Sequence, residues 1–179
     1  MFSIKTHLGP LALAANILQS SSTRLEHVPL VFAMLYHHFH TLLTAEGADE
    51  DEKNACTTVI SSAEKHWKAA DQDIFLAAII LHPGLKLRPL NPEIFSYADI
   101  YMLFTRVYLH LFPGTTTAPS ALEEDVKAYL DNTGCFRCLA HLYITRLDRA
   151  EKNNTSPVSK PLLMSIEVLI QNAAQENWA

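Results

Sequence analysis

Two cysteines and a histidine in the C-terminal half have the short spacing that zinc ligands often show. Cys135 and Cys138 form a Cys-x2-Cys pair, and His141 follows after two further residues. Thiolate and imidazole groups bind zinc at such spacings, but a structural zinc site needs a fourth ligand, and the sequence has no second pair of this kind. The same spacing also places three residues along one face of a helix. Two interpretations therefore stay open, and buried structural cysteines are favoured over a metal site.

A second group of potential ligands consists of the histidines His37, His38 and His40. His37 and His40 are three residues apart, so they can share one face of a helix. No carboxylate stands at the Glu-x-x-His spacing that is typical of metal sites in helical bundles. Histidine is also favourable in the last turn of a helix, where the imidazolium interacts with the terminal carbonyl groups. We therefore expect these residues to mark the end of a helix.

Carboxylates that could support catalysis gather near Trp67, where Asp71, Gln72, Asp73 and Phe75 follow in short order. Asp71 and Asp73 are two residues apart, so they cannot share a helix face and make no obvious two-metal pair. We expect Trp67 and Phe75 to pack inward and Asp71 to be exposed or to cap a helix. The sequence has no Gly-rich phosphate loop, no GxSxG and no HExxH. It therefore predicts that the chain is not an enzyme and needs no cofactor.

The elements that must position these residues are predicted to be helices. Leu and Ala dominate the apolar residues, glycines number only 5, and alternating β-branched runs are scarce. Steps of three and four between apolar residues, with Pro, Gly and Asn as boundaries, indicate roughly seven helices in a single domain spanning residues 1–179. Their expected ranges are 11–19, 24–44, 55–81, 91–112, 120–134, 136–151 and 162–175.

The boundaries of these helices rest on specific signals. Pro29 should lie in the first turn of its helix or kink it. The acidic run 46–53 is expected to be a solvated loop, and residues 152–161 a polar linker. Ser120 and Glu123 match a capping box. The helix over 91–112 is apolar nearly all round, so it should be central, and the fold class is an irregular all-α bundle.

The charge balance restricts the partners of the chain. The formal net charge is −5, and residues 46–53 contain 5 of the 19 acidic residues and 1 of the 14 basic ones. The remainder is nearly neutral and has no basic stripe, so direct nucleic-acid binding is not expected. Three cysteines and no signal sequence argue against a disulfide framework. We expect no membrane span and an intracellular protein, either nuclear or cytoplasmic.

Part of the chain resembles fungal hAT-family transposase-like proteins. Trp67, the pair Asp71-Gln72, and Leu81 with Pro83 follow a pattern common in that family, with His66 where the family has Arg and His82 where it has Asn. Further resemblance lies in Gln19, Thr23-Arg24-Leu25 and Leu35-Tyr36, and in Val126-Lys127-x-Tyr129-Leu130 followed by Thr133-Gly134-x-Phe136. Together these segments cover roughly residues 8–140.

The resemblance implies a ribonuclease H-like transposase core interrupted by a helical insertion, of which this chain is similar to the insertion and the helices after it. The family's catalytic acids, two Asp and one Glu, lie outside the resembling region, as does the DNA-reading zinc finger. The expected function is therefore a non-catalytic fragment of a DNA transposition protein that serves as a protein-interaction or dimerisation module. We expect self-association, or poor solubility, of the isolated chain through exposed apolar residues of 11–18 and 162–170. The alternative is a free-standing helical protein that binds a metal or a small molecule, the latter in a pocket lined by residues 97–112.

Overall fold

The computed structural model of the chain describes residues 4–21 and 23–153, and the regular secondary structure in these ranges is helical, without a β-strand. The described helices are α1 (Ile4–Leu18), α2 (His27–Leu43), α3 (Glu50–Ala69), α4 (Gln72–Leu81), α5 (Tyr97–Leu111), α6 (Ala121–Leu130), the 3-10 helix η1 (Gly134–Phe136) and α7 (Leu139–Lys152). The prediction of an all-α fold with about seven helices is thus confirmed. The helix predicted for 162–175 and most of the linker 152–161 lie outside the described residues.

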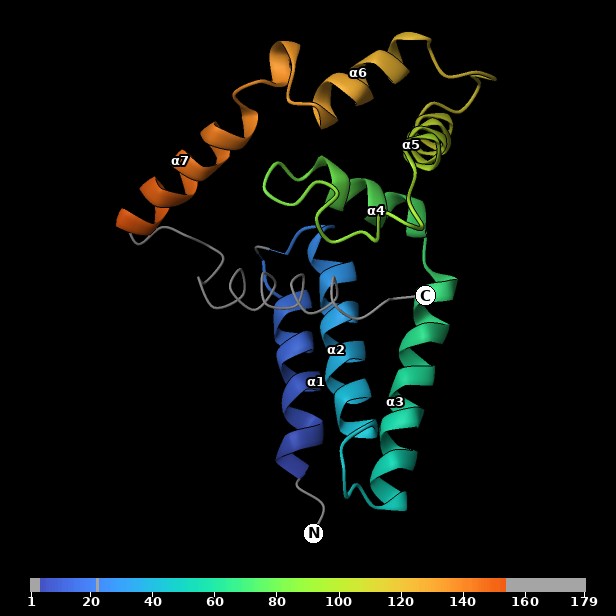
Figure 1. Cartoon of the computed structure of the whole chain (residues 1–179), viewed down its shortest axis with the longest axis vertical. Helices are drawn as coiled ribbons and strands as arrows, with labels where there is room; N and C mark the ends of the chain where they lie inside the picture. The colour runs from blue at the N-terminus through green and yellow to red at the C-terminus, as the bar shows by residue number, and fades with distance from the viewer. Residues whose placement is uncertain (1–3, 22, 154–179) are drawn as a thin grey trace.

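The described helices form two packed groups, which Figure 1 shows one above the other. In the first group α1, α2 and α3 lie side by side, with α2 in contact with both of its neighbours. In the second group α4 packs against α5, which in turn contacts α6. The helix α7 extends to one side of this second group (Figure 1). The chain passes from one group to the other at the break between α3 and α4.

The first group is closed around α2. Its residues Leu30, Val31 and Phe39 are buried, and Phe39 is fully inaccessible. Cys56 of α3 is also fully buried, and Ala14 of α1 is 5% exposed. Burying large aliphatic and aromatic side chains in this way supplies about 1.5–3 kcal/mol for each one removed from water.

The second group has a larger core. Its buried residues come from α4, α5 and α6, and half-buried residues of η1, α7 and the connector after α4 pack against them. The buried members are Ala77, Ile80, Ile100, Leu103, Phe104, Val126 and Tyr129. A smaller cluster of Leu30, Ile79 and Leu85 joins α2 to α4 and to the connector. Because Ile79 and Ile80 face different clusters, α4 connects the two groups.

The first helix, predicted over 11–19, begins earlier than expected, because α1 starts at Ile4 and contains Pro10. Proline has no N–H and cannot donate to the carbonyl four residues earlier, which is that of Thr6. The Nε2 atom of His38 lies 3.1 Å from the Thr6 carbonyl oxygen and donates to it in place of the missing amide. A side chain of α2 thus satisfies the acceptor that Pro10 leaves open in α1.

Two further boundaries differ from the sequence prediction because acidic side chains cap helices. The acidic run predicted as a loop instead begins α3: Asp49 is its N-cap, and the Asp49 carboxylate accepts a hydrogen bond from the Glu52 amide at 2.8 Å. The acids that follow lie in the first turn, where the helix dipole favours negative charge. The single helix predicted over 55–81 is divided into α3 and α4, with Asp71 as the N-cap of α4.

The helix predicted to begin at Asn91 instead begins after Ser96. The Ser96 side chain accepts from the Asp99 amide, while the Asp99 carboxylate accepts from the Ser96 amide, which makes a capping box. Asn91 accepts from the Glu93 amide in the preceding turn. The capping box predicted at Ser120 is not formed, because Ser120 has helical backbone angles and makes no side-chain cap.

The expectation that this helix would be central was also wrong. Only Ile100, Leu103 and Phe104 of α5 are buried, and they lie on one side of the helix. Met102, on the opposite side of the helix, is 51% exposed, and Leu111, the last residue of the helix, is 59% exposed.

The second core predicts that two isoleucines contribute very differently to the free energy of unfolding. Ile80 is fully buried and Ile94 is 51% exposed. We expect Ile80→Ala to lower the free energy of unfolding by about 3 kcal/mol, because the substitution removes buried methylene groups and leaves a cavity. Ile94→Ala should change it by less than about 0.5 kcal/mol. Urea denaturation followed by circular dichroism measures both, and equal losses for the two variants would contradict this core.

Candidate functional site

The cysteine and histidine group predicted as a metal candidate lies around the start of α7. Cys135 belongs to η1, Cys138 follows it, and His141 lies in the first turn of α7. All three are exposed, so the expectation of buried cysteines was wrong. In residues 4–21 and 23–153 no three His, Cys, Asp or Glu side chains are grouped closely enough to hold a metal ion. Cys56, by contrast, is buried against His7, with its Sγ 3.9 Å from Nε2, and burial raises the pKa of this thiol.

The histidines of α2 lie in the last turns of the helix, as expected. His38 donates to α1, as described above, and the His40 ring stacks on that of Tyr36 with 5.7 Å between ring centroids. Thr44 ends the helix, with its amide donating to the His40 carbonyl. The structure therefore assigns His38 and His40 packing and hydrogen-bonding contacts.

The family-like residues around Trp67 form the break between α3 and α4. The Gln72 side chain donates to the Trp67 carbonyl at 3.2 Å, which satisfies an acceptor at the end of α3. The Asp71 carboxylate lies 3.5 Å from the Ile74 amide, where it caps α4. The Trp67 ring lies between Phe32 and Phe75, at centroid distances of 5.8 and 6.1 Å. This arrangement confirms the expected capping role of Asp71 and places the motif's side chains in a helix junction.

Asp73 points to a different partner. Its two carboxylate oxygens accept from Nε and Nη2 of Arg106 on α5, at 2.6 and 2.8 Å. The guanidinium lowers the pKa of the Asp73 carboxyl group through these hydrogen bonds. Because Asp71 and Asp73 have separate partners, they do not converge on a shared position where a metal could bind.

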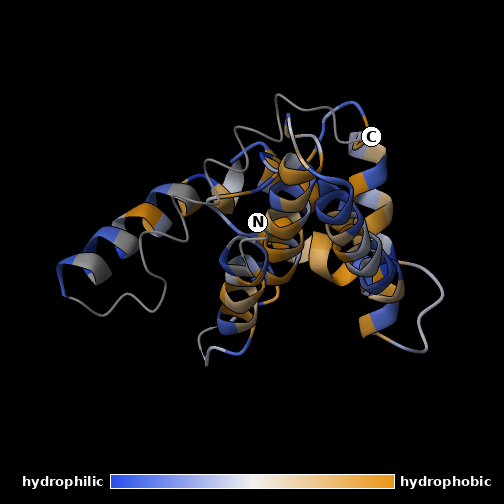
Figure 2. Ribbon diagram, turned by 90° about the horizontal axis from the view of Figure 1, so that it is seen from below, coloured by the Kyte–Doolittle hydropathy of each residue, from blue (hydrophilic) through white to orange (hydrophobic). Residues whose placement is uncertain are grey.

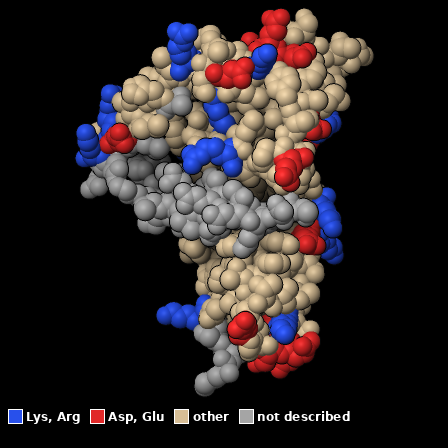
Figure 3. Space-filling model, viewed as in Figure 1, with Lys and Arg blue, Asp and Glu red and all other residues tan. Residues whose placement is uncertain are grey.

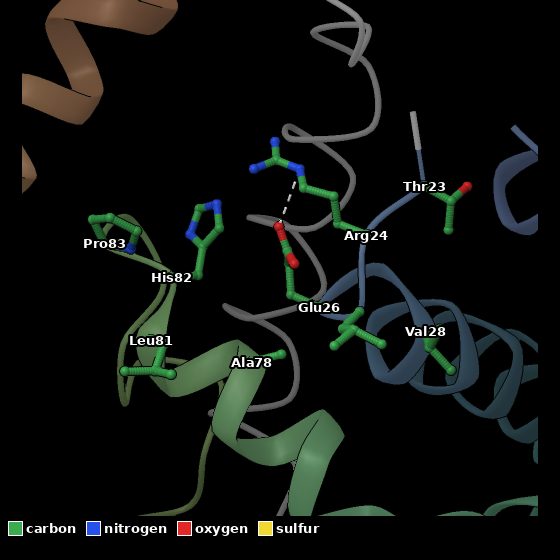
Figure 4. Close-up of a pocket in the computed structure, with 9 residues that line it drawn as sticks. Thr23, Arg24, Glu26, Val28, Ala78, Leu81, His82 and Pro83 are labelled. Carbon is green, nitrogen blue, oxygen red and sulfur yellow. Dashed lines mark ion pairs between the residues drawn. The ribbon is translucent and has the colours of Figure 1, made fainter. Parts of the chain in front are cut away.

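The polar residues that the structure does bring together lie between the start of α2 and the end of α4. In the described part of the chain the buried polar or charged residues are Glu26, His27 and His82, each less than a tenth exposed. Glu26 pairs with Arg24, with 3.3 Å between Oε1 and Nε. Figure 4 shows this pair on one side and His82 on the other side of a groove. The sequence did not indicate this cluster, because its members come from segments far apart in the chain.

The groove has a volume of about 650 Å³ and is mostly apolar. Its lining residues come from the segment before α2, from α2 itself and from the end of α4. They are Thr23, Arg24, Leu25, Glu26, Val28, Ala78, Leu81, His82 and Pro83. Leu81 and Pro83 thus lie opposite Thr23-Arg24-Leu25, a segment more than 50 residues earlier in the chain. An apolar groove with a few polar groups has the composition of a ligand-binding site.

Both ring nitrogens of His82 have partners. The Gly84 amide donates to Nδ1 at 3.3 Å, so Nδ1 carries no proton, and Nε2 lies 2.9 Å from the Tyr143 hydroxyl of α7. In the neutral ring Nε2 therefore bears the hydrogen and donates it to Tyr143. The edge of one ring meets the face of the other, with 4.8 Å between centroids.

Burial keeps the histidines of this cluster neutral. It lowers the pKa of His82 and of His27 below the ordinary value of 6.5, and nearby Arg24 acts in the same direction. The Glu26 carboxylate opposes this shift for both rings. His27 resembles His82 in its hydrogen bonding, since its Nδ1 accepts from the Arg24 amide at 3.2 Å. Burial also raises the pKa of the Tyr143 hydroxyl, so this group stays protonated at neutral pH.

The groups of this cluster are arranged for binding a ligand and not for acid–base chemistry. Neutral imidazole is the form of a general base, but the His82 nitrogens are both hydrogen-bonded, and the nearby hydroxyl belongs to a tyrosine whose pKa is raised. The exposed groups that reach the groove are the Arg24 guanidinium and apolar side chains.

No family model, no curated protein and no solved structure matches the chain. In the described residues, no helix is both long enough and apolar enough to cross a membrane.

The contact between His38 and the Thr6 carbonyl predicts a non-additive pair of substitutions. His38→Ala should lower the free energy of unfolding by about 1–2 kcal/mol, because it leaves that carbonyl without a donor. In a Pro10→Ala background the alanine amide supplies the missing donor, so the same change should cost about 1 kcal/mol less. Urea denaturation of the two single variants and the double variant measures this coupling. Strictly additive losses would show that His38 does not replace the proline amide.

The lowered pKa values of His27 and His82 predict acid-sensitive stability. Below pH 6.5 the unfolded chain takes up protons that the folded chain resists, so the free energy of unfolding should fall as the pH falls. Well above pH 6.5, where the histidines of the unfolded chain are neutral too, these two groups should contribute no further change. Urea denaturation at a series of pH values tests this, with the exposed His110 changed to Asn as a control that keeps the acid response. A higher stability at pH 5 than at pH 7 would contradict the prediction.

Proposed function

We propose that this chain is a non-catalytic helical module, similar to part of a hAT-family transposase, that associates with another protein chain through the outward side of α5. A second copy of the chain is the first partner to test. The observation that carries the proposal is the apolar stripe on α5, which no described segment covers.

The α5 stripe consists of Met102 and Leu109, which are seven residues apart on one side of α5, and of Phe112, which directly follows the last residue of the helix. Met102 and Phe112 are each 51% exposed, and Leu109 is half-buried. The Tyr108 ring contacts that of Phe112, with centroids 4.6 Å apart, and widens the stripe. Aromatic residues and methionine are enriched at the centres of protein interfaces.

Other exposed apolar residues are more scattered. On α1, Leu8 is 57% and Leu13 is 50% exposed, and the part of this helix predicted to be exposed also contains the buried Ala14. The second predicted patch, residues 162–170, lies outside the described residues. On α7, which Figure 2 shows at one side of the molecule, Leu142 and Ile144 are exposed among polar neighbours. The α5 stripe is the more continuous surface and includes an aromatic pair.

The charges of the described surface support a protein partner over a nucleic acid. Lys and Arg side chains are scattered over the face that Figure 3 shows, and the acidic start of α3 adds negative charge. Nucleic-acid binding by a single domain usually depends on a basic patch or stripe.

The α5 stripe predicts a dimer that two lysine substitutions abolish. We expect sedimentation velocity to show concentration-dependent association of the chain, and expect Met102→Lys with Phe112→Lys to leave a folded monomer, because two charges would have to be buried. Leu142→Lys with Ile144→Lys is the matched control, since it introduces the same two charges at residues of α7 that are 57% and 55% exposed. A wild-type chain that stays monomeric at every accessible concentration would refute self-association.

The non-catalytic part of the proposal has a separate test. Asp71 caps a helix and Asp73 pairs with Arg106, so neither is positioned to bind catalytic metal ions. The chain is incubated with plasmid and short duplex DNA in Mg²⁺ and in Mn²⁺, and cleavage and strand transfer are followed on gels. We expect neither reaction. Metal-dependent cleavage that is lost in Asp73→Asn would overturn this part.

The groove beside Arg24 favours a second candidate function, the binding of a small apolar molecule that carries one polar group. The Glu26 carboxylate holds the Arg24 guanidinium through Nε, and the side chain of Arg24 is still 49% exposed at the groove. A thermal-shift panel tests this candidate: a ligand should raise the melting temperature of the chain and have no such effect on Leu81→Lys, which places a charge in the apolar lining. No stabilisation by any compound would remove this candidate.

A further inference from the structure

The helix α7 makes few contacts with the other described elements. Its Leu139 packs on the edge of the second core, and its Tyr143 contacts His82 and Gly84. It has no extensive packing against another described helix, and Leu142 and Ile144 are more than half exposed. In Figure 1 it extends away from the rest of the described chain. Tyr143 is therefore a principal contact, within the part of the chain that the structure describes, between α7 and the turn that follows α4.

Tyr143 fits closely over the turn that follows α4. A Cβ atom added to Gly84 would lie 2.9 Å from Cε1 of Tyr143 and 3.4 Å from Cε1 of His82. Only glycine allows the tyrosine ring to approach the backbone this closely. The ring thus covers the imidazole and helps to keep His82 out of water, at 9% exposure.

Protonation of His82 is incompatible with this arrangement. A proton on Nδ1 would face the Gly84 amide, which is itself a donor, so that hydrogen bond would be lost. The imidazolium would also be buried, with Arg24 and His27 nearby as basic groups and Glu26 as the acidic group that opposes them. From α7 the facing titratable group is the Tyr143 hydroxyl, which carries no charge at neutral or acid pH. Hydration of the charged ring requires that Tyr143 move away.

We propose that the contact of His82 with Tyr143 and Gly84 is an acid-sensitive latch, in which protonation of His82 releases α7 from the rest of the described chain. Release also separates Leu139, a half-buried residue of α7, from the edge of the second core. The first and second groups of helices keep their own cores. The latch is independent of the proposed association through α5, since α7 and the α5 stripe share none of the residues involved.

Hydrogen exchange read by mass spectrometry tests the latch on the whole chain. Exchange rates are corrected for the intrinsic effect of pH and compared between pH 7.5 and pH 5, with α3 as the internal reference. We expect the amides of α7 to exchange several-fold faster relative to those of α3 at the lower pH. Equal behaviour of α7 and α3 across this range would overturn the proposal.

Three variants separate the latch from a general loss of stability. His82→Asn retains an acceptor for the Gly84 amide but cannot take up a proton, and it does not reach Tyr143, so α7 should exchange fast at both pH values. Gly84→Ala displaces the Tyr143 ring without changing a titratable group, and it should give the same result. His110→Asn removes an exposed histidine and should behave as the wild type. An acid response of α7 that persists in the first two variants would overturn the proposal.

An NMR pH titration of the wild-type chain tests the latch without any substitution. If the latch operates, the His82 ring signals and the amide signals of α7 change with the same midpoint, at a pH below 6.5. If the α7 amides respond with a different midpoint from His82, another group controls the helix and the proposal fails.

Discussion

The burial of α4 on two sides is the constraint on which the described fold depends. This helix has only ten residues, and it places Ile79 against Leu30 of α2 while Ile80 and Ala77 enter the core made with α5 and α6. A short helix that is apolar on nearly all sides cannot be stable in water, so it must lie between two groups of elements. Within the described residues, the contacts between the first three helices and the later elements include those of α4 and of the connector that follows it. The groove and the His82 cluster lie at the C-terminal end of α4, where this helix meets the segment that begins α2.

The sequence predicted the fold class and the side-chain periodicity well because those depend on local patterns. Apolar residues three and four apart indicate a helix wherever it packs, and Asp71 was correctly expected as exposed or capping. The boundaries were harder, since several are decided by contacts between distant segments. Pro10 lies inside α1 because His38, from another helix, donates to the carbonyl that the proline leaves open. No pattern within residues 4–18 contains that information.

The candidate site was beyond the sequence for a related reason. Its polar members stand at the end of one helix, before the start of another and within a third, and no regular spacing connects them. Cys135, Cys138 and His141 have the spacing that attracts attention, yet they are exposed around the start of α7. The resemblance to transposase-like proteins pointed to Leu81, Pro83 and Thr23-Arg24-Leu25 as separate segments. The structure places those segments on the two sides of one groove, with His82 between Leu81 and Pro83.

Two features of the described residues bear on how the chain could act. The α5 stripe offers an apolar surface on a helix that is anchored on its other side by Ile100, Leu103 and Phe104, so that it is rigid enough to bind a partner. The region around His82 couples the position of α7 to proton concentration. The α5 stripe concerns the partner that the chain binds. The His82 region concerns the position that α7 takes when the chain binds it.

Association through the α5 stripe is tested most directly by hydroxyl-radical footprinting of the chain at low and at high protein concentration. Oxidation of methionine and phenylalanine side chains depends on their exposure, so the method locates an interface without any substitution. If the chain associates through the α5 stripe, Met102 and Phe112 become protected as the concentration rises, while Leu142 and Ile144 of α7 do not. Unchanged oxidation of the α5 stripe, or protection confined to α7, would contradict it.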